Sequence, residues 1–96
     1  MRFEWDEIKN HRNLGKHKIS FETAKLVFDD VLALNLQDRV VEGEERWQIL
    51  GMIKGVVVVV AYTYREEGED LVTRIISARK ATSAERRAYE SHEASS

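Results

Sequence analysis

Two arginines in the C-terminal part of the chain, Arg74 and Arg79, have surroundings suited to anion chemistry. No acidic residue occurs between Val72 and Ala84, although the whole chain carries a formal net charge of -2. A guanidinium group stays charged and can bind a phosphate or a carboxylate through two parallel hydrogen bonds. These arginines therefore need an external anion or a distant Asp or Glu, and ordinary solvated surface cations are the competing explanation.

Two further arginines, Arg46 and Arg65, fall near the ends of predicted strands. A hairpin brings the start of one strand beside the end of the next, so both are expected towards one end of the sheet. Arginines around a phosphate suit the stabilisation of a pentacovalent phosphorane. Arg74 and Arg79 are five residues apart, so an unbroken strand would point them to opposite faces. Both can serve one site only if the strand ends near Ser77 or contains a bulge.

Proton transfer at such a site could come from His17 and Lys16, in a predicted loop between two helices. Imidazole suits acid–base work near neutral pH, whereas a loop histidine bonded to the backbone is the competing explanation. The chain has no cysteine, and His11 and His17 are not spaced as two metal ligands on one helix. Neither a Gly-x-Ser-x-Gly turn nor a glycine-rich phosphate loop occurs. Among hydrolytic mechanisms, arginine-assisted phosphoryl chemistry without a metal or other cofactor fits these residues best.

Charge is distributed unevenly along the chain. Residues 9–18 hold four lysines or arginines and no acid. Paired carboxylates at residues 29–30, 44–45 and 66–67 fall in predicted turns, where solvated charge is the ordinary explanation. The pI near 5.9 argues mildly against a general nucleic-acid binder, because phosphate affinity comes from clustered Lys and Arg. The low net charge nevertheless hides local basic zones.

Length and composition indicate one small globular domain. The chain has 96 residues, of which 43% are hydrophobic and 33% charged. We expect residues 1–90 to form the domain and residues 91–96 to be the end of a helix and a polar tail that frays. The N-terminus lacks the apolar stretch of a signal peptide, and the apolar run at residues 56–62 is too short to span a membrane. A cytoplasmic protein is expected.

The N-terminal third predicts a strand and two helices. Aromatic residues alternate at residues 3–5, as in a short strand. Asp6 is placed to cap a helix over residues 7–14, which Gly15 would end. Ser20 is placed to cap a second helix over residues 21–28, which the acidic pair 29–30 would end.

The remaining two thirds predict four strands and a final helix. Strands are expected at residues 31–36, 46–53, 56–64 and 71–77, with loops at 38–45 and 65–70 and a tight turn at Lys54–Gly55. The strand at 56–64 is apolar on both faces, so it is expected in the centre. Thr82 and Glu85 form a capping box for a helix over residues 82–93. The order β-α-α-β-β-β-β-α predicts an α+β fold, a twisted antiparallel sheet with helices packed on one face.

Several of these segments together resemble the BrnT toxins. The resemblance begins with FEWDxxKxxxNxxKHxISFExA at residues 3–24. It continues in the same order to residue 89, through the acidic pair 29–30, Arg46 with Gly51, YTYR at 62–65, RIISARxA at 74–81 and ERxxY at 85–89. The RIISAR segment and the opening WDxxK are specific in combination.

The resemblance implies a RelE-like fold and a toxin of a type II toxin–antitoxin system that cleaves RNA and stops translation. Arg79 and Arg74 would be transition-state and phosphate ligands, Arg46 and Arg65 would support them, and Lys16 and His17 would be the candidates for proton transfer. The 2′-hydroxyl of the substrate would attack phosphorus without a metal. A BrnA-like antitoxin would neutralise the toxin in a hetero-oligomer and bind operator DNA. A non-catalytic RNA-binding or protein-interaction module on the same fold is the alternative.

Overall fold

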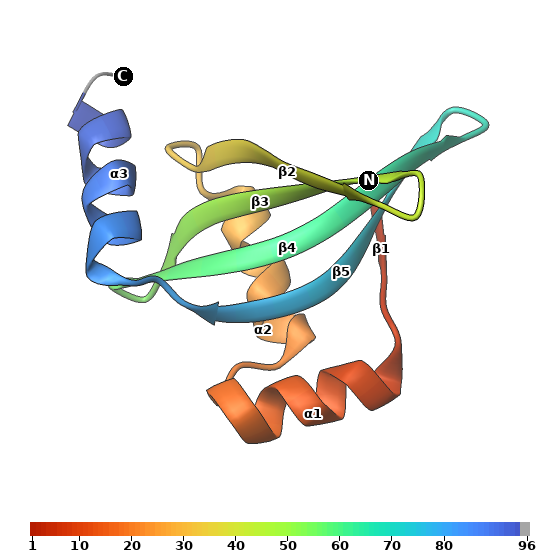
Figure 1. Cartoon of the computed structure of the whole chain (residues 1–96), viewed down its shortest axis with the longest axis horizontal. Helices are drawn as coiled ribbons and strands as arrows, with labels where there is room; N and C mark the ends of the chain where they lie inside the picture. Colours follow the sequence, from red (N-terminus) through yellow and green to blue (C-terminus); the bar gives the residue numbers. More distant parts are fainter. Residues whose placement is uncertain (95–96) are drawn as a thin grey trace.

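The computed structural model describes residues 1–94 (Figure 1). Within them, five strands form one sheet against which the helices pack. The predicted α+β class and the order β-α-α-β-β-β-β-α are confirmed. Of the tail expected to fray, residues 91–94 belong to the last helix, and residues 95–96 lie outside the described part. In chain order the elements are β1 (Arg2–Glu4), α1 (Glu7–His17), α2 (Phe21–Ala24), the 3₁₀ helix η1 (Lys25–Asp29), β2 (Leu34–Val41), β3 (Glu44–Ile53), β4 (Val56–Glu67), β5 (Asp70–Lys80) and α3 (Ser83–Ala94).

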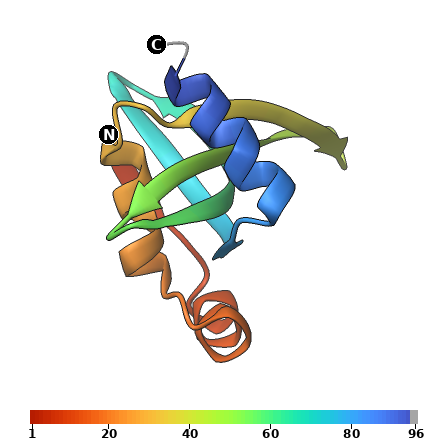
Figure 2. The ribbon, with the colours of Figure 1, turned by 90° about the vertical axis from the view of Figure 1, so that its left-hand side faces the viewer.

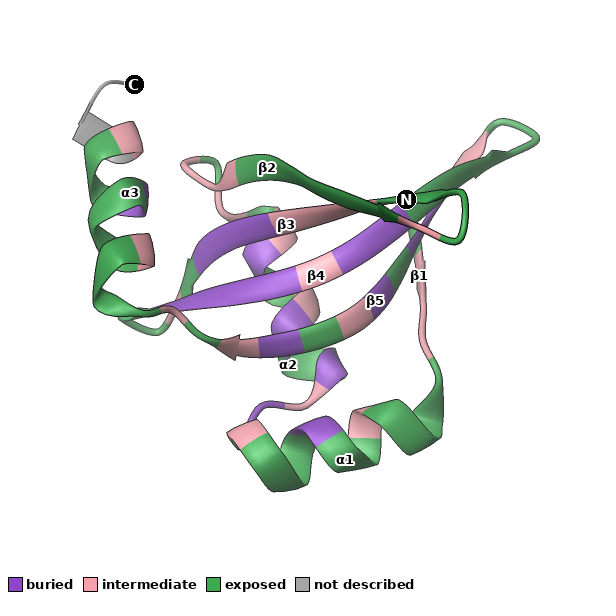
Figure 3. Ribbon diagram, viewed as in Figure 1, coloured by how far each residue is buried: buried purple, intermediate pink, exposed green. Residues whose placement is uncertain are grey.

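The central strand of the sheet is β4, as predicted, and the strand order is β1-β5-β4-β3-β2. Strands β2 to β5 form an antiparallel meander. The short β1 joins the outer side of β5 in parallel, with Arg2 opposite Val72. Figure 3 shows the result for burial: β4 is buried through its middle, whereas the edge strand β2 is exposed along most of its length.

Helices cover both faces of the sheet (Figure 2). On one face, Phe21 of α2 and Val27 of η1 pack in a core cluster with Val60 of β4. On the other face, Tyr89 of α3 packs in a second cluster with Val59. The expectation of helices on one face is therefore wrong. Because β4 is apolar on both faces, each face needs its own cover against water.

Close packing of η1 on β3 depends on Gly51. A Cβ at this position would lie 2.8 Å from the Cβ of Val27 and 3.0 Å from the carbonyl oxygen of Val27. Val27 is fully buried, so it cannot move aside without opening the core. Glycine at position 51 therefore allows the helix to lie directly on the strand.

The predicted helix caps are present. The carboxylate of Asp6 accepts hydrogen bonds from the backbone at the start of α1, and the hydroxyl of Ser20 accepts one from the backbone N–H of Thr23. In the capping box of α3, Glu85 N–H donates to the Thr82 hydroxyl, and Thr82 N–H donates to the Glu85 carboxylate. No helix within residues 1–94 is long and apolar enough to cross a membrane.

Several predicted boundaries are wrong. Gly15 lies inside α1, which continues to His17, and Lys18 instead takes the left-handed conformation with φ 61° and donates its N–H to Leu14. The second helix becomes 3₁₀ after Ala24. The strand predicted at residues 31–36 begins at Leu34 and runs to Val41, and the predicted loops 38–45 and 65–70 shrink to tight turns. Most polar residues of the predicted loops belong instead to the exposed ends of paired strands.

Candidate functional site

Strand β5 carries one extra residue opposite the Ala61–Tyr62 step of its partner β4. Tyr62 lies opposite Ile75, and its neighbour Ala61 lies opposite Ser77, so Ile76 has no partner in the register. Such a bulge sets two residues of one strand against one of the other and resets the alternation of faces. A bulge of this kind is what Arg74 and Arg79 need if both are to serve one site.

The bulge places Arg74 and Arg79 on one face of the sheet. Arg74 lies opposite Thr63, and Arg79 lies opposite Val59. Thr63 and Val59 are four residues apart on β4, so they and their partners share a face. Four residues of extended strand span about 13 Å, so the two arginine backbones are separated by roughly that distance.

Arg46 lies on this same face. It precedes Trp47, which is partly buried and packs against the core cluster on the face of α2 and η1, so strand alternation turns Arg46 to the other side. Continuing the β3–β4 register by one residue brings Arg46 beside Thr63, with Arg74 beyond it. The Nε of Arg46 is buried without a hydrogen-bond partner. The surface formed by Arg46, Arg74 and Arg79 is called the arginine face below.

Small side chains separate the arginines. Ala61 and Ser77 lie opposite each other midway between Arg74 and Arg79. From β3, Gln48 lies opposite Ala61. The helix α3 stands at the Arg79 end of this face (Figure 1). An anion placed over the two small residues would therefore have arginines within side-chain reach on both sides.

Arg79 has a carboxylate partner in the folded chain. Its guanidinium donates to both oxygens of Glu85 at 2.7 and 2.9 Å, and the two side chains are 37% and 25% exposed. The hydrogen bonds from Arg79 lower the pKa of Glu85 to about 2, against the opposing effect of burial. Arg79 was predicted to need an external anion or a distant acid. The acid is Glu85, just beyond the acid-free stretch.

Arg74 makes no hydrogen bond or ion pair with any residue in the described part of the chain. Its charge acts on two neighbours at the start of α1 and the end of β1. The pKa of Glu4 is lowered mainly by hydrogen bonds from Arg65, with a smaller effect of Arg74. The pKa of Asp6 is lowered mainly by backbone N–H groups, again with a smaller effect of Arg74. Within the arginine face, Arg74 is thus the exposed arginine that is free to bind a ligand.

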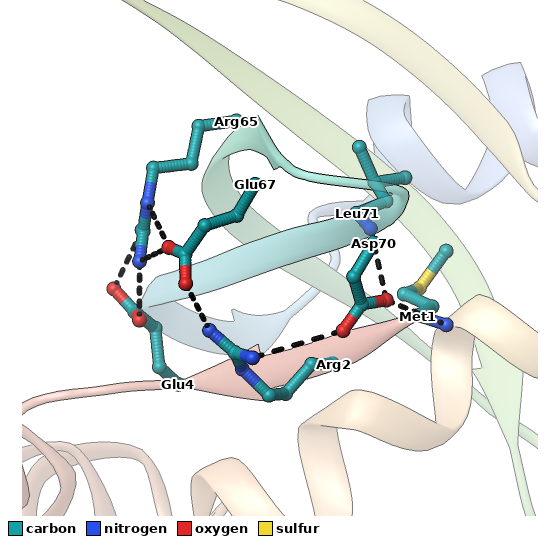
Figure 4. Close-up of polar contacts among 7 residues, drawn as sticks. All are labelled: Met1, Arg2, Glu4, Arg65, Glu67, Asp70 and Leu71. Carbon is teal, nitrogen blue, oxygen red and sulfur yellow. Dashed lines mark hydrogen bonds and ion pairs between the residues drawn. The ribbon is translucent and has the colours of Figure 1, made fainter.

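Arg65 belongs to a network of ion pairs instead (Figure 4). It donates two hydrogen bonds to Glu4, at 2.9 and 3.0 Å, and further ones to Glu67. Arg2 joins the network at 2.8 Å from Glu67 and 3.8 Å from Asp70. These carboxylates raise the pKa of Arg65. The network fastens β1 to the hairpin of β4 and β5. Arg65 is two residues from Thr63 and so shares the face of Arg74, but its guanidinium is engaged by Glu4 and Glu67 in this structural task.

Lys16 and His17 lie in the last turn of α1 rather than in a loop. They line a groove of about 320 Å³ between α1 and β5. Ser77 of β5 also lines it, so the groove adjoins the arginine face. Within residues 1–94, no three His, Asp or Glu side chains gather as a metal-binding group. This groove is called the α1 groove below. The residues that line it are Lys9, Arg12, Asn13, Lys16, His17, Ile76 and Ser77.

Asn13 fixes α1 against β5, a role that sequence reasoning missed. Its side-chain amide donates to the carbonyl oxygens of Ala78 and Ile19, both at 2.8 Å, and accepts from the N–H of Ala78 at 3.1 Å. The side chain thereby replaces a neighbouring strand at the outer edge of β5. An asparagine within a helix is unfavourable for helix formation, and that was the available signal.

Asp30 is a second structural residue that sequence reasoning missed. It was interpreted as solvated charge, and this is wrong. Its carboxylate accepts from Met52 N–H at 2.8 Å, from Leu32 N–H at 2.9 Å and from the Tyr89 hydroxyl at 2.6 Å. Burial acts to raise the pKa of Asp30, but these hydrogen bonds outweigh it and leave the pKa lowered. Asp30 thus connects the end of η1 with β3 and α3.

Comparison with known families gives one match. The family described as the ribonuclease toxin BrnT of type II toxin–antitoxin systems matches residues 5–85. That range contains every residue of the arginine face and of the α1 groove. A search of curated proteins finds no match.

Proposed function

The chain belongs to the BrnT family of ribonuclease toxins from type II toxin–antitoxin systems, and we propose that it cuts RNA on its arginine face. A toxin of this class has RNA as its target and an antitoxin as its partner. The family identifies the activity. The choice of Arg46, Arg74 and Arg79 as the residues that carry it rests on their shared face.

The bulge at Ile76 is the single observation that carries this choice. Without it, five residues of alternation would send Arg74 and Arg79 to opposite faces. With it, they lie on one face with Arg46, around the small side chains of Ala61 and Ser77. A phosphodiester over this floor meets guanidinium groups that are charged at every physiological pH.

The proposed reaction is a transesterification within RNA. The 2′-oxygen attacks the adjacent phosphorus and forms a new O2′–P bond while the P–O5′ bond breaks, which leaves a 2′,3′-cyclic phosphate and a 5′-hydroxyl. The negative charge that grows on the phosphorane oxygens is stabilised by Arg46 and Arg74. The buried Nε of Arg46 has no hydrogen-bond partner in the described part of the chain, so a substrate oxygen that reached it would satisfy this donor.

Arg79 can join only by exchanging ligands. Its guanidinium is held by both oxygens of Glu85, so a phosphate must displace part of that pair. Proton transfer is assigned to His17 and Lys16, because both line the groove that Ser77 shares with the arginine face. One takes the proton from the 2′-hydroxyl, and the other delivers a proton to the departing O5′.

The partner is proposed to be a BrnA-like antitoxin that holds the toxin in a hetero-oligomer and supplies all contact with operator DNA. Residues 1–90 are proposed as the toxin domain. RNA as the target places the proposed action in the cytoplasm. Co-expression gives a direct check: growth arrest on expression of the toxin should be relieved by co-expression of its antitoxin.

The test of the site is cleavage of RNA by the purified protein in EDTA. The wild type should yield 2′,3′-cyclic phosphate ends, whereas Arg74→Ala and Arg46→Ala should each lower kcat/KM about 100-fold or more. Arg87→Ala is the matched control, since Arg87 is an exposed arginine of α3 outside the arginine face. Wild-type activity in Arg74→Ala and Arg46→Ala would reject the site. RNA binding without cleavage by the wild type would favour a non-catalytic module.

A further inference from the structure

We propose that the α1 groove binds the sugar–phosphate backbone of the RNA segment that flanks the cut. This inference rests on the proposed ribonuclease function and adds a second binding surface to it. Three features of the groove support it: the arrangement of its cations, their lack of internal partners, and the rigid position of α1 beside β5.

The cations of the groove form one stripe along the helix. Lys9, Arg12, Asn13 and Lys16 follow the spacing i, i+3, i+4 and i+7, which places them on one side of α1. From Lys9 to Lys16 the helix rises by about 10 Å at 1.5 Å per residue. A stripe of this length can face more than one consecutive phosphate of a nucleic-acid strand.

These cations have no carboxylate partner within ion-pair distance in the described part of the chain. The contrast is with Arg2, Arg65 and Arg79, which are all paired. The helix dipole accounts for Lys16 in the last turn, where a cation is favourable. It does not account for Lys9, which lies in the first turn, where a cation is unfavourable. Asp6 offsets part of this cost, since the charge of Lys9 helps to lower the pKa of Asp6, and a phosphate in the groove would add a further favourable interaction.

The groove is held in shape before any ligand arrives. Asn13 lies at its base, 7% exposed, and bonds to both the N–H and the C=O of Ala78. Since β1 ends opposite Arg74 and Asn13 lies at Ala78, α1 runs along β5 in the direction of the strand. A strand of RNA that leaves the arginine face past Ser77 would enter the groove without crossing another element.

The chemistry of the lining favours RNA over an acidic protein segment. Ile76 is the one apolar residue among the seven that line the groove. A protein segment gains most of its affinity from apolar and aromatic anchors in buried pockets. A single strand of RNA gains it from phosphate contacts, which need cations alone.

The experiment compares Lys9→Gln/Arg12→Gln with Lys54→Gln/Arg87→Gln, which removes two exposed charges outside the groove. Neither pair includes a residue assigned to the reaction. For a single-stranded RNA of about 20 nucleotides, the groove variant should raise KM about tenfold and leave kcat within twofold. For a dinucleotide substrate, both variants should behave as wild type. Binding of a 2′-O-methyl RNA, which cannot be cut, should lose about 0.7 from its salt slope for each phosphate contact removed.

An unchanged KM and an unchanged salt slope for the long RNA would overturn the groove, whether or not it serves an acidic protein. An equal loss on the dinucleotide would also overturn it, since a flanking site cannot act there. Failure of the wild type to cut any RNA would instead reject the proposed function. Thermal unfolding of each variant, expected at the wild-type temperature, checks that the exposed substitutions leave the fold intact.

Discussion

Arg79 donates two hydrogen bonds to Glu85, at 2.7 and 2.9 Å, across the junction of β5 and α3. The same carboxylate accepts the N–H of Thr82 at 2.9 Å as part of the helix cap. Glu85 therefore stabilises the start of α3 and at the same time holds the guanidinium of Arg79, which the proposed site needs. The two tasks can be separated, because a capping box accepts glutamine in place of glutamate.

Glu85→Gln should strengthen RNA binding. The neutral amide keeps the cap but gives up the charged pair, so a phosphate reaches Arg79 with less competition. We expect KM for RNA to fall about threefold to tenfold, equivalent to roughly 1 kcal/mol, with kcat within twofold. Steady-state kinetics will measure it, with Glu90→Gln as a control of the same charge change on the same helix. A large fall of kcat would show that Glu85 takes part in the reaction itself.

The Arg79–Glu85 pair should also make stability depend on pH. The pKa of Glu85 falls from 4.5 to about 2 in the folded chain. A carboxyl with a lowered folded-state pKa adds stability above its unfolded pKa and loses it as pH falls towards the folded value. The wild type should therefore melt at a higher temperature than Glu85→Gln above pH 5, and the difference should shrink between about pH 4.5 and pH 2. A difference that stays constant with pH would contradict this assignment.

Asn13→Ala should destabilise the fold and loosen α1. The substitution leaves the N–H and C=O of Ala78 without partners at the edge of β5. Each unsatisfied buried group costs about 1–3 kcal/mol, so we expect a loss of about 2–4 kcal/mol in the free energy of unfolding. Urea denaturation measures it, with His11→Ala as the control at an exposed position of the same helix. A loss equal to that of the control would show that Asn13 does not hold the helix.

The parts of the fold that the sequence predicts correctly depend on short-range signals. Asp6, Ser20 and the pair Thr82–Glu85 cap their helices through residues no more than three apart. The turn at Lys54–Gly55 is local as well, with φ of 49° and 82°. Each of these signals contains its whole physical cause within a few residues, so no knowledge of the tertiary structure is needed.

The parts that were missed depend on distant residues. Asn13 and Ala78 are 65 positions apart, and Asp30 and Tyr89 are 59 apart. Neither pairing leaves a local pattern. From the sequence, a bulge between Arg74 and Arg79 could be named as a requirement of the site. Whether the bulge exists depends on the register of β4 and β5, which the sequence does not reveal. That both faces of the sheet are covered could have been predicted from the sequence, because β4 is apolar on both sides.

Arg46 offers a test in which stability and activity move in opposite directions. Its Nε is buried without a hydrogen-bond partner, and an unsatisfied buried donor costs about 1–3 kcal/mol. Arg46→Met keeps a long unbranched side chain and removes the donor, so we expect a gain of about 1 kcal/mol. For a chain of this size, that is a rise of roughly 4–8 °C in melting temperature.

The same variant should lose cleavage. Methionine offers no positive charge to a phosphorane, so kcat/KM for RNA should fall about 100-fold or more while the protein becomes more stable. Calorimetry and RNA cleavage on the same preparation will measure both, with Arg87→Met, at an exposed position of α3, as the control. A fall in stability would show that the guanidinium supports the fold. Retained activity would show that Arg46 does not contact the reacting phosphate. A stable and inactive protein is the outcome expected if the orphaned Nε is reserved for the substrate.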